Sequence, residues 1–210
     1  MRVLIACEES GHVRDAFIAR GHDAMSCDLQ PTSNPGPHYQ GDVFDIINDG
    51  WDLMIAHPPC THLACSGSRH FEKKIADGRQ QEGIDLFMRF TETDIPRVCI
   101  ENPVCIMSSH WRRPDQIIQP YYFGDEAQKT TCLWLKNLPP LMHFSADDLL
   151  DKQTHVDNGG QVGGDDYKMS KWFYETSCLP VAERSKARSK TFPGIAREMA
   201  RQWGNLEQQP

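Results

Sequence analysis

The sequence predicts an α/β fold built around a mostly parallel sheet. Through residues 1–140, short apolar runs alternate with stretches of helical periodicity, which is the order expected of strands joined by helical crossovers. Polar residues follow directly after several of the apolar runs, and glycines and prolines mark where the runs end. The carboxyl ends of parallel strands share one edge of a sheet, so we expect these polar residues to gather there.

The elements of the first third follow from these patterns. Val3–Cys7 is apolar throughout and predicts a buried strand, and Val13–Ala19 has apolar residues at helical spacing before a glycine. Ala24–Cys27 predicts a second strand. Val43–Ile47 predicts a short helix or turn. Trp51–Ala56 predicts a third strand, which two prolines end.

The rest of the chain continues the alternation and then changes character. Gln80–Phe90 predicts a helix, and Arg97–Ile100 and Thr131–Leu135 predict strands. A final helix is expected over Ile195–Trp203, since a proline stands in its first turn. Between the last predicted strand and this final helix lies a glycine-rich segment without clear periodicity.

We therefore divide the chain into three parts. Residues 1–144 are expected to form the α/β core, and residues 145–188 a small irregular insert. Residues 189–210 are expected to form a C-terminal segment whose helix returns to the core. The insert carries Asn158–Gly160 and Gly163–Asp166, which are typical of a loop or small subdomain.

Composition narrows the class of protein. With 39% hydrophobic and 24% charged residues, the chain of 210 residues is neither disordered nor membrane-like. No apolar stretch approaches the ~20 residues of a membrane span, and no signal-type cleavage site follows the N-terminal run. We expect a cytoplasmic protein without a membrane partner, as a monomer or weak dimer. The net charge of -7 argues against indiscriminate coating of nucleic acid.

The cysteines and histidines offer a metal site as one alternative. The eight cysteines are scattered without a CxxC pair, so we expect reduced thiols, mostly buried, and no metal. Five metal-ligand side chains nevertheless crowd one segment, namely His57, Cys60, His62, Cys65 and His70. Their spacing fits no common zinc motif, and we expect His57 to pack beside the proline turn.

Two motifs at predicted strand ends carry candidate catalytic groups. Cys60 follows two prolines, which stiffen the turn and fix where the thiol points. A reactive cysteine needs thiolate character and partial exposure, and an inert thiol is the alternative. Glu101 and Asn102 follow another strand, where a carboxylate would be either solvated or placed to accept from a cytosine amino group.

Acidic residues after the first strands suggest a nucleoside cofactor. Asp28 lies about twenty residues beyond the first strand turn, where an acid commonly binds ribose hydroxyls. Asp42 could reach an adenine ring, and the segment Glu8–Gly11 forms the first turn. Ordinary loop acids are the alternative for each residue taken alone.

Taken in order, these motifs resemble the DNA (cytosine-5) methyltransferases over residues 1–138. The motifs are Gly11, Asp28, Gly41-Asp42, Pro59-Cys60, Glu101-Asn102 and Gln128-Lys129. Three longer stretches are also similar to the family, namely Val13–Phe17, Trp51–Cys60 and Arg97–Asn102. The segment Lys190–Ile195 resembles the family's C-terminal return to the cofactor.

The resemblance implies a Rossmann-like S-adenosylmethionine-dependent methyltransferase fold and C5 methylation of cytosine in DNA. Cys60 would attack C6 and Glu101 would hold the ring nitrogen and the amine of a base that has left the duplex stack. The implied catalytic residues are Pro59, Cys60, Glu101, Asn102 and Lys129. The residues implied to hold S-adenosylmethionine are Cys7, Glu8, Ser10, Gly11, Asp28, Leu29, Asp42, Val43 and His57.

The chain also departs from the family pattern. The first turn has two extra acids and few glycines, and Pro103 replaces a valine. Gln128-Lys129 lacks the arginines of the family motif, and residues 145–188 form only a reduced target-recognition region. Two alternatives therefore stay open, an enzyme acting on a pyrimidine nucleotide and a non-catalytic DNA-binding homologue.

Basic and aromatic residues are candidates for contacting nucleic acid. The cations that could contact phosphates are Arg112, Arg113, Arg184, Lys186, Arg188 and Lys190. For the last four, a solvated helix start or loop is the alternative. The aromatic residues Trp172, Phe173 and Tyr174 would either stack on bases or anchor the insert to the core, and the second interpretation is favoured.

Overall fold

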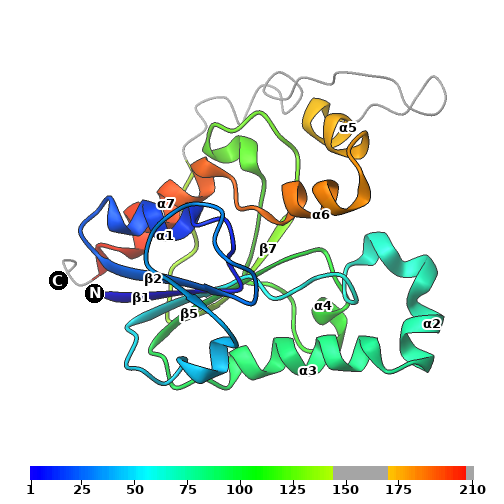
Figure 1. The fold of residues 1–210 in the computed structure, drawn as a ribbon, viewed down its shortest axis with the longest axis horizontal. Coiled ribbons are helices and arrows are strands. Elements are labelled where there is room, and N and C mark those ends of the chain that lie inside the picture. Colours follow the sequence, from blue (N-terminus) through cyan, green and yellow to red (C-terminus); the bar gives the residue numbers. More distant parts are fainter. Residues whose placement is uncertain (144–169, 207–210) are drawn as a thin grey trace.

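The computed structural model describes residues 1–143 and 170–206 and has one seven-stranded sheet flanked by helices (Figure 1). The strands are β1 (Arg2–Ala6), β2 (Asp23–Asp28), β3 (His38–Gln40), β4 (Leu53–Ala56), β5 (Arg97–Pro103), β6 (Gln116–Ile118) and β7 (Thr131–Lys136). The spatial order is β3-β2-β1-β4-β5-β7-β6. The first five strands in this order run parallel, and β7 runs antiparallel to both of its neighbours.

The helices follow the strands in chain order. The α-helices are α1 (His12–Ile18), α2 (Phe71–Ala76), α3 (Arg79–Thr91), α4 (Met107–His110), α5 (Lys171–Ser177), α6 (Val181–Ser189) and α7 (Pro193–Trp203). Three short 3-10 helices are η1 (Val43–Asp45), η2 (Cys65–His70) and η3 (Pro120–Phe123). None of the helices in the described ranges has the length and apolar character that crossing a membrane requires.

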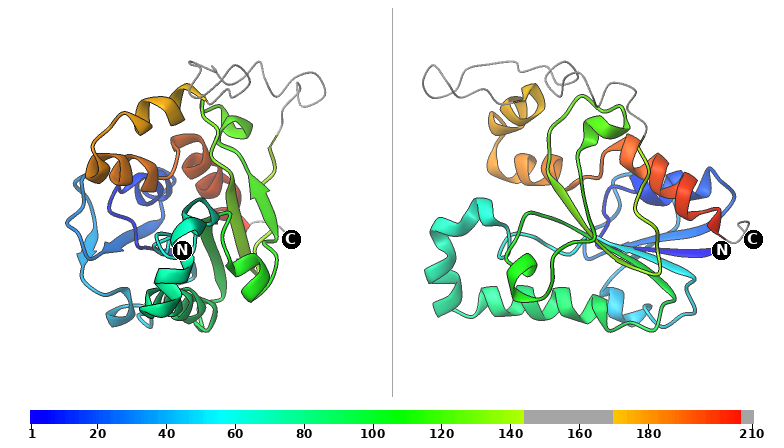
Figure 2. Two further views of the ribbon diagram at one scale, coloured as in Figure 1. Left: turned by 90° about the vertical axis from the view of Figure 1, so that its right-hand side faces the viewer. Right: turned by 180° about the vertical axis from the view of Figure 1, so that it is seen from behind.

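Alternating side chains of the central strands build a core on each face of the sheet. Leu4 of β1 points to the face that α3 covers, where Phe87 and Trp134 meet edge to face at 5.2 Å. Val3 and Ile5 point to the other face, which α1 and α7 cover. Figure 2 shows these helices on opposite sides of the sheet, so the fold has three layers.

The α/β architecture and the mostly parallel sheet predicted from the sequence are confirmed. β5 is longer than predicted, since it extends through Pro103, and Glu101 and Asn102 therefore lie within the strand. The prediction of an irregular insert over residues 145–188 is wrong for its last part, because α5 and α6 form there. The glycine-rich segments Asn158–Gly160 and Gly163–Asp166 lie outside the described residues.

Candidate functional site

The strand order reverses direction between β1 and β4, and a crevice opens at the carboxyl ends of these two strands. Ligands of open α/β sheets bind at such a switch point. The turn after β1 begins at Cys7, which has a left-handed φ of 58°, and ends at Gly11, where φ is 74°. Both residues are in the backbone region that non-glycine residues rarely adopt, so the turn reverses sharply into α1.

Glu8 fixes this turn from within. Its carboxylate is buried and accepts hydrogen bonds from the backbone N–H of Val13 at 2.7 Å and of Arg14 at 3.3 Å. It also accepts from the Ser10 hydroxyl at 3.3 Å. The carboxylate therefore satisfies the free N–H groups in the first turn of α1. Glu8 lines the crevice, but its carboxylate oxygens already accept hydrogen bonds from within the protein.

A smaller pocket of about 260 Å³ lies at the ends of β2 and β3. Its lining residues are Cys7, Cys27, Asp28, Leu29, Gly41, Asp42, Val43, Phe44, Pro59 and Leu86. One oxygen of Asp28 accepts from the Gln30 N–H at 2.8 Å, and Asp42 accepts from the Phe44 N–H at 3.0 Å. The pocket thus combines two carboxylates with apolar walls, which suits a flat heterocycle that carries hydroxyl groups.

A larger cavity of about 750 Å³ adjoins it and contains Cys60. Its lining residues are Cys7, Glu8, Glu9, Ser10, Asp28, His57, Pro59, Cys60, Thr61, Arg69, Val181, Arg184, Ser185, Arg188, Ser189 and Thr191. The two pockets share Cys7, Asp28 and Pro59 as walls. All the residues predicted to hold the cofactor line one pocket or the other, except Gly11, which starts α1.

The loop that carries Cys60 is held in place by its neighbours. Asn102 donates a side-chain hydrogen bond to the Pro58 carbonyl at 2.8 Å, and the Cys60 carbonyl accepts from the N–H groups of Leu63 and Ala64. Cys60 itself is half-buried. These contacts connect the end of β5 to the proline turn after β4, and they set the thiol at the cavity wall.

The surroundings of Cys60 favour the protonated thiol over the thiolate. Burial is the main cause that raises the pKa of Cys60 above its ordinary value, and the negative charge of Glu101 raises it further. The positive charges of Lys129 and Lys74 act in the opposite direction but do not outweigh them. Nucleophilic use of Cys60 would therefore need a base or a ligand that shifts this balance.

His57 and Glu101 form a buried pair next to Cys60. The ring Nδ1 lies 2.9 Å from Glu101 Oε2, and both side chains are about nine-tenths buried. A carboxylate can only accept, so Nδ1 carries the hydrogen and Nε2 is the remaining ring nitrogen. His57 lines the large cavity and Glu101 does not, so Glu101 is connected to the cavity through His57.

The surroundings of Glu101 favour its ionised form although the side chain is buried. Burial would raise its pKa, but the charge of Lys129 and the hydrogen bond from His57 bring the pKa below its usual value. Lys129 is half-buried, and its backbone N–H donates to Gln119 Oε1 at 3.0 Å. The predicted catalytic residues Pro59, Cys60, Glu101, Asn102 and Lys129 thus come together at the ends of β4, β5 and β7.

Two buried polar atoms in this group have no hydrogen-bond partner among the described residues. They are His57 Nε2 and Asn102 Oδ1. Each such atom costs roughly 1–3 kcal/mol when unpaired. Native folds retain few unpaired buried polar groups, and those that remain ask for an explanation in function or in a bound molecule.

The predicted basic residues divide between two places. Arg112 stacks on Trp111 at 4.5 Å and pairs with Asp115 at 2.7 Å, so it lies at a separate pocket that includes Trp134. The neighbouring Arg113 is exposed. In contrast, α6 brings its cations to the large cavity.

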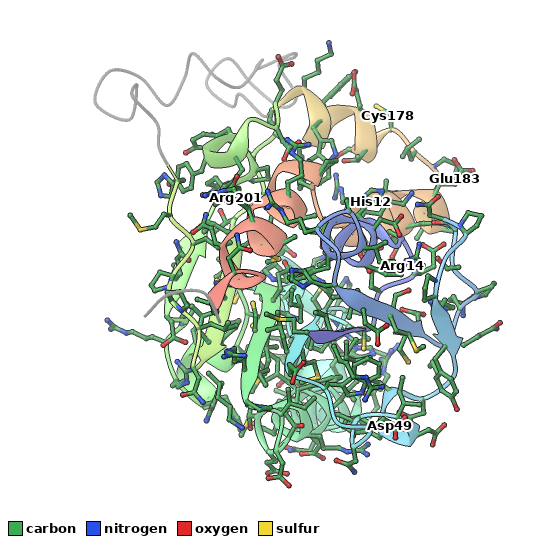
Figure 3. The ribbon with its side chains drawn as sticks, turned by 90° about the vertical axis from the view of Figure 1, so that its left-hand side faces the viewer. His12, Arg14, Asp49, Cys178, Glu183 and Arg201 are labelled. Carbon is green, nitrogen blue, oxygen red and sulfur yellow. The ribbon has the colours of Figure 1, made fainter. Side chains whose placement is uncertain are left out.

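Helix α6 lies across the turn after β1 (Figure 3). Lys186 pairs with Glu9 at 2.8 Å, and the His12 ring donates to the Thr191 carbonyl at 2.9 Å. Arg184 and Arg188 line the cavity, and half-buried Lys190 acts on Glu9 through its charge. No local sequence pattern predicted that this helix would line one cavity with Cys60.

Two of the three aromatic residues that were candidates for base stacking pack against neighbouring side chains of the protein. Trp172 meets Phe192 at 5.0 Å, and the Arg188 guanidinium lies over the Phe173 ring at 4.1 Å. Tyr174 is exposed. Two of the three rings therefore have an anchoring role.

The described residues contain no cluster of three or more His, Cys, Asp or Glu side chains that could hold a metal ion. All eight cysteines are described, and each is free. Sequence reasoning missed Arg69 as a cavity residue, and no local pattern marks it. Thr191, which also lines the cavity, lies in the segment Lys190–Ile195 that the resemblance had related to the cofactor.

Comparison with models of known protein families gives no match, and no curated protein is significantly similar in sequence. The functional argument therefore depends on the residues and geometry of the two adjoining pockets.

Proposed function

We propose that this protein is an S-adenosylmethionine-dependent methyltransferase that modifies C5 of cytosine in DNA through a covalent adduct with Cys60. The main support is one juxtaposition. A half-buried thiol lines a cavity at the sheet's switch point, next to a carboxylate-lined pocket and to the charges of Glu101 and Lys129.

The smaller pocket fits the adenosyl part of the cofactor. Asp28 uses one carboxylate oxygen for the Gln30 N–H, which leaves the second for ribose hydroxyls. Leu29, Val43 and Phe44 offer apolar contacts to an adenine ring, and Asp42 lies at the same wall. When bound, S-adenosylmethionine would supply an electrophilic methyl group at the boundary of the two pockets.

Cys60 would carry the covalent chemistry. Its thiolate attacks C6 of cytosine and forms an S–C bond, which makes C5 nucleophilic. After C5 has gained the methyl group, loss of the C5 proton releases the electron pair that breaks the S–C6 bond. The thiol must first lose its proton, because burial and Glu101 raise its pKa.

The His57–Glu101 pair would handle the protons of the ring. Attack at C6 places negative charge on the pyrimidine, and the ring nitrogen must take up a proton to disperse it. His57 lines the cavity with its Nδ1–H bonded to Glu101. An imidazolium that also carries a hydrogen on Nε2 would pass that proton to the ring nitrogen and become a neutral imidazole that still donates to Glu101 through Nδ1. This arrangement differs from the direct contact of Glu101 with the base that the resemblance implies.

A pyrimidine nucleotide is the second candidate substrate. The Cys60 cavity is bounded by α6 as well as by the strand ends, and the chain has a net charge of -7. Both properties favour a small ligand over a long stretch of duplex.

Cofactor binding can be tested by calorimetric titration of S-adenosylmethionine into the wild type and Asp28→Ala. We expect the variant to bind at least about tenfold more weakly, because a ribose contact is lost. Asp23→Ala is the matched control, since Asp23 begins the same strand and is exposed. Absence of binding to the wild type, with DNA binding retained, would identify a non-catalytic homologue.

Adduct formation tests the chemistry directly. An oligonucleotide that contains 5-fluorocytosine should form a denaturation-resistant complex with the wild type in the presence of S-adenosylmethionine. Cys60→Ser should abolish the complex, because the serine oxygen is a far weaker nucleophile. If neither the oligonucleotide nor 5-fluoro-dCMP forms an adduct, the proposal is wrong.

A further inference from the structure

The cations of α6 do not all have the same surroundings. Lys186 forms an ion pair with Glu9 at 2.8 Å. Arg188 donates to the hydroxyls of Thr176 at 3.0 Å and Ser177 at 2.7 Å, and so connects α6 to α5. These two side chains fix the position of the helix.

Arg184 differs from both of them. It lines the Cys60 cavity and is half-buried, and within the described residues no carboxylate pairs with it. The pKa of Arg188 is lowered, first by burial and then by the charge of Arg184. Arg184 therefore brings to the cavity a positive charge that no ion pair among the described residues engages.

A third arginine, in addition to Arg184 and Arg188 of α6, reaches the same cavity from another part of the chain. Arg69 lies in η2, is exposed, and contacts the His70 ring through Nε at 3.0 Å. No carboxylate in the described part of the chain pairs with it. Two guanidinium groups from different elements thus line one cavity with Cys60.

Within the described residues, none of the acids that line the cavity forms an ion pair with Arg184 or Arg69. The Glu8 carboxylate is used by the first turn of α1, and Glu9 is paired with Lys186. Asp28 lies at the wall shared with the smaller pocket. An anion entering beside Cys60 would meet arginines whose forked donors match the oxygens of a phosphate group.

We propose that Arg184 and Arg69 form a phosphate subsite for the 5′-phosphate of the pyrimidine nucleotide whose base lies against Cys60. The proposal rests on the proposed function, because it takes the Cys60 cavity as the site of the base. The same chemistry serves a free nucleotide or the target nucleotide of a DNA strand.

The test compares binding of dCMP and deoxycytidine by the full chain without cofactor, using calorimetry on the Cys60→Ser background so that no adduct forms. We expect dCMP to bind about tenfold more tightly than deoxycytidine. Arg184→Gln should remove this preference. Arg201→Gln should keep it, because Arg201 is on α7 and pairs with Glu198 (Figure 3).

A pentanucleotide with one central cytosine distinguishes the two sources of the phosphate. Tighter binding of the pentanucleotide than of dCMP, lost in Arg184→Gln, assigns the subsite to a DNA strand, and the reverse order assigns it to a nucleotide. Equal binding of dCMP and deoxycytidine, no binding of either phosphate probe, or an equal loss in Arg201→Gln would overturn the proposal. Thermal unfolding of each variant checks that it is folded.

The binding comparison and the 5-fluorocytosine adduct assay together separate the phosphate subsite from the methyl-transfer chemistry. A phosphate preference without any 5-fluorocytosine adduct on the wild type would keep the subsite and reject the role of Cys60. An adduct without a phosphate preference would keep Cys60 and reject the subsite.

Discussion

The two halves of the ligand-binding edge use their polar side chains differently. On the β1–β2 half, the Glu8 carboxylate caps α1 and Asp42 caps η1. Buried Arg14 bonds Ser26 and the Asn34 carbonyl, which organises the loop after β2. On the β4–β5 half, His57 Nε2 and Asn102 Oδ1 are buried without a partner among the described residues.

This difference separates polar groups that support the fold from polar groups that are left open to a ligand. A polar group that is satisfied within the protein contributes to stability and has little left to offer a ligand. A polar group that is left unpaired lowers stability, and a bound molecule or a shift of the proline turn can satisfy it. We therefore expect substitutions of the satisfied groups Glu8 and Arg14 to change mainly stability, and substitutions of His57 and Asn102 to change mainly activity.

The largest expected effect in this comparison is that of His57→Gln. A glutamine amide can still donate to Glu101, but it cannot take up or release a proton. We expect kcat/KM for methyl transfer to fall about a hundredfold, with a change in unfolding free energy below about 1 kcal/mol. Steady-state kinetics across pH and urea unfolding measure both quantities. Activity equal to the wild type with an unchanged pH profile would remove His57 from proton transfer.

The next largest effect is on stability and comes from Glu8→Ala. The substitution leaves the N–H groups of Val13 and Arg14 without their acceptor in a buried place, so we expect a loss of about 2 kcal/mol. Urea denaturation measures it, and Glu8→Gln should lose less because one acceptor oxygen remains. If Glu8→Ala is as stable as the wild type but no longer binds S-adenosylmethionine, the two halves do not differ as described.

The smallest effect is a shift in the pH dependence of Cys60. Its pKa is raised by burial and by Glu101, so the thiolate fraction is small near neutral pH and grows as pH rises. Glu101→Gln removes a negative charge and should lower the pKa, which makes alkylation by iodoacetamide faster at a given pH. Lys129→Met should act in the opposite direction. Mass spectrometry of the modified Cys60 peptide over a pH series measures the rates, and unchanged profiles in both variants would contradict this electrostatic coupling.

Most of the core could be predicted because its signals are local. Val3–Cys7 and Trp51–Ala56 are apolar runs that match β1 and β4 within two residues. The helix over Gln80–Phe90 showed its buried face in the spacing of Ile84 and Phe87, and α3 buries both. Short or half-exposed elements such as β3 and α6 were missed, since tertiary contacts rather than periodicity define them.

The sequence allowed us to predict which residues lie at the candidate site, but not which of their side chains contact one another. The position of Cys60 and Asp28 after strands places them at one edge of any parallel sheet. The bond between His57 and Glu101 joins residues 44 apart in sequence, and no local pattern signals it. The same is true of Arg69 and Arg184, which line one cavity because α6 folds back over the first turn.

The packing of α7 has a consequence for how the chain is made. α7 lies against α1, and the fully buried Trp203 belongs to the same core as Val3 and Ile5 of the first strand. In a nascent chain, α1 is therefore made directly after β1, but the part of this face that α7 covers stays open until nearly two hundred residues after β1 have been synthesised. Residues 1–144 are thus not expected to be an autonomous folding unit, and a premature stop before Pro193 would leave an adhesive apolar surface for chaperones or proteases.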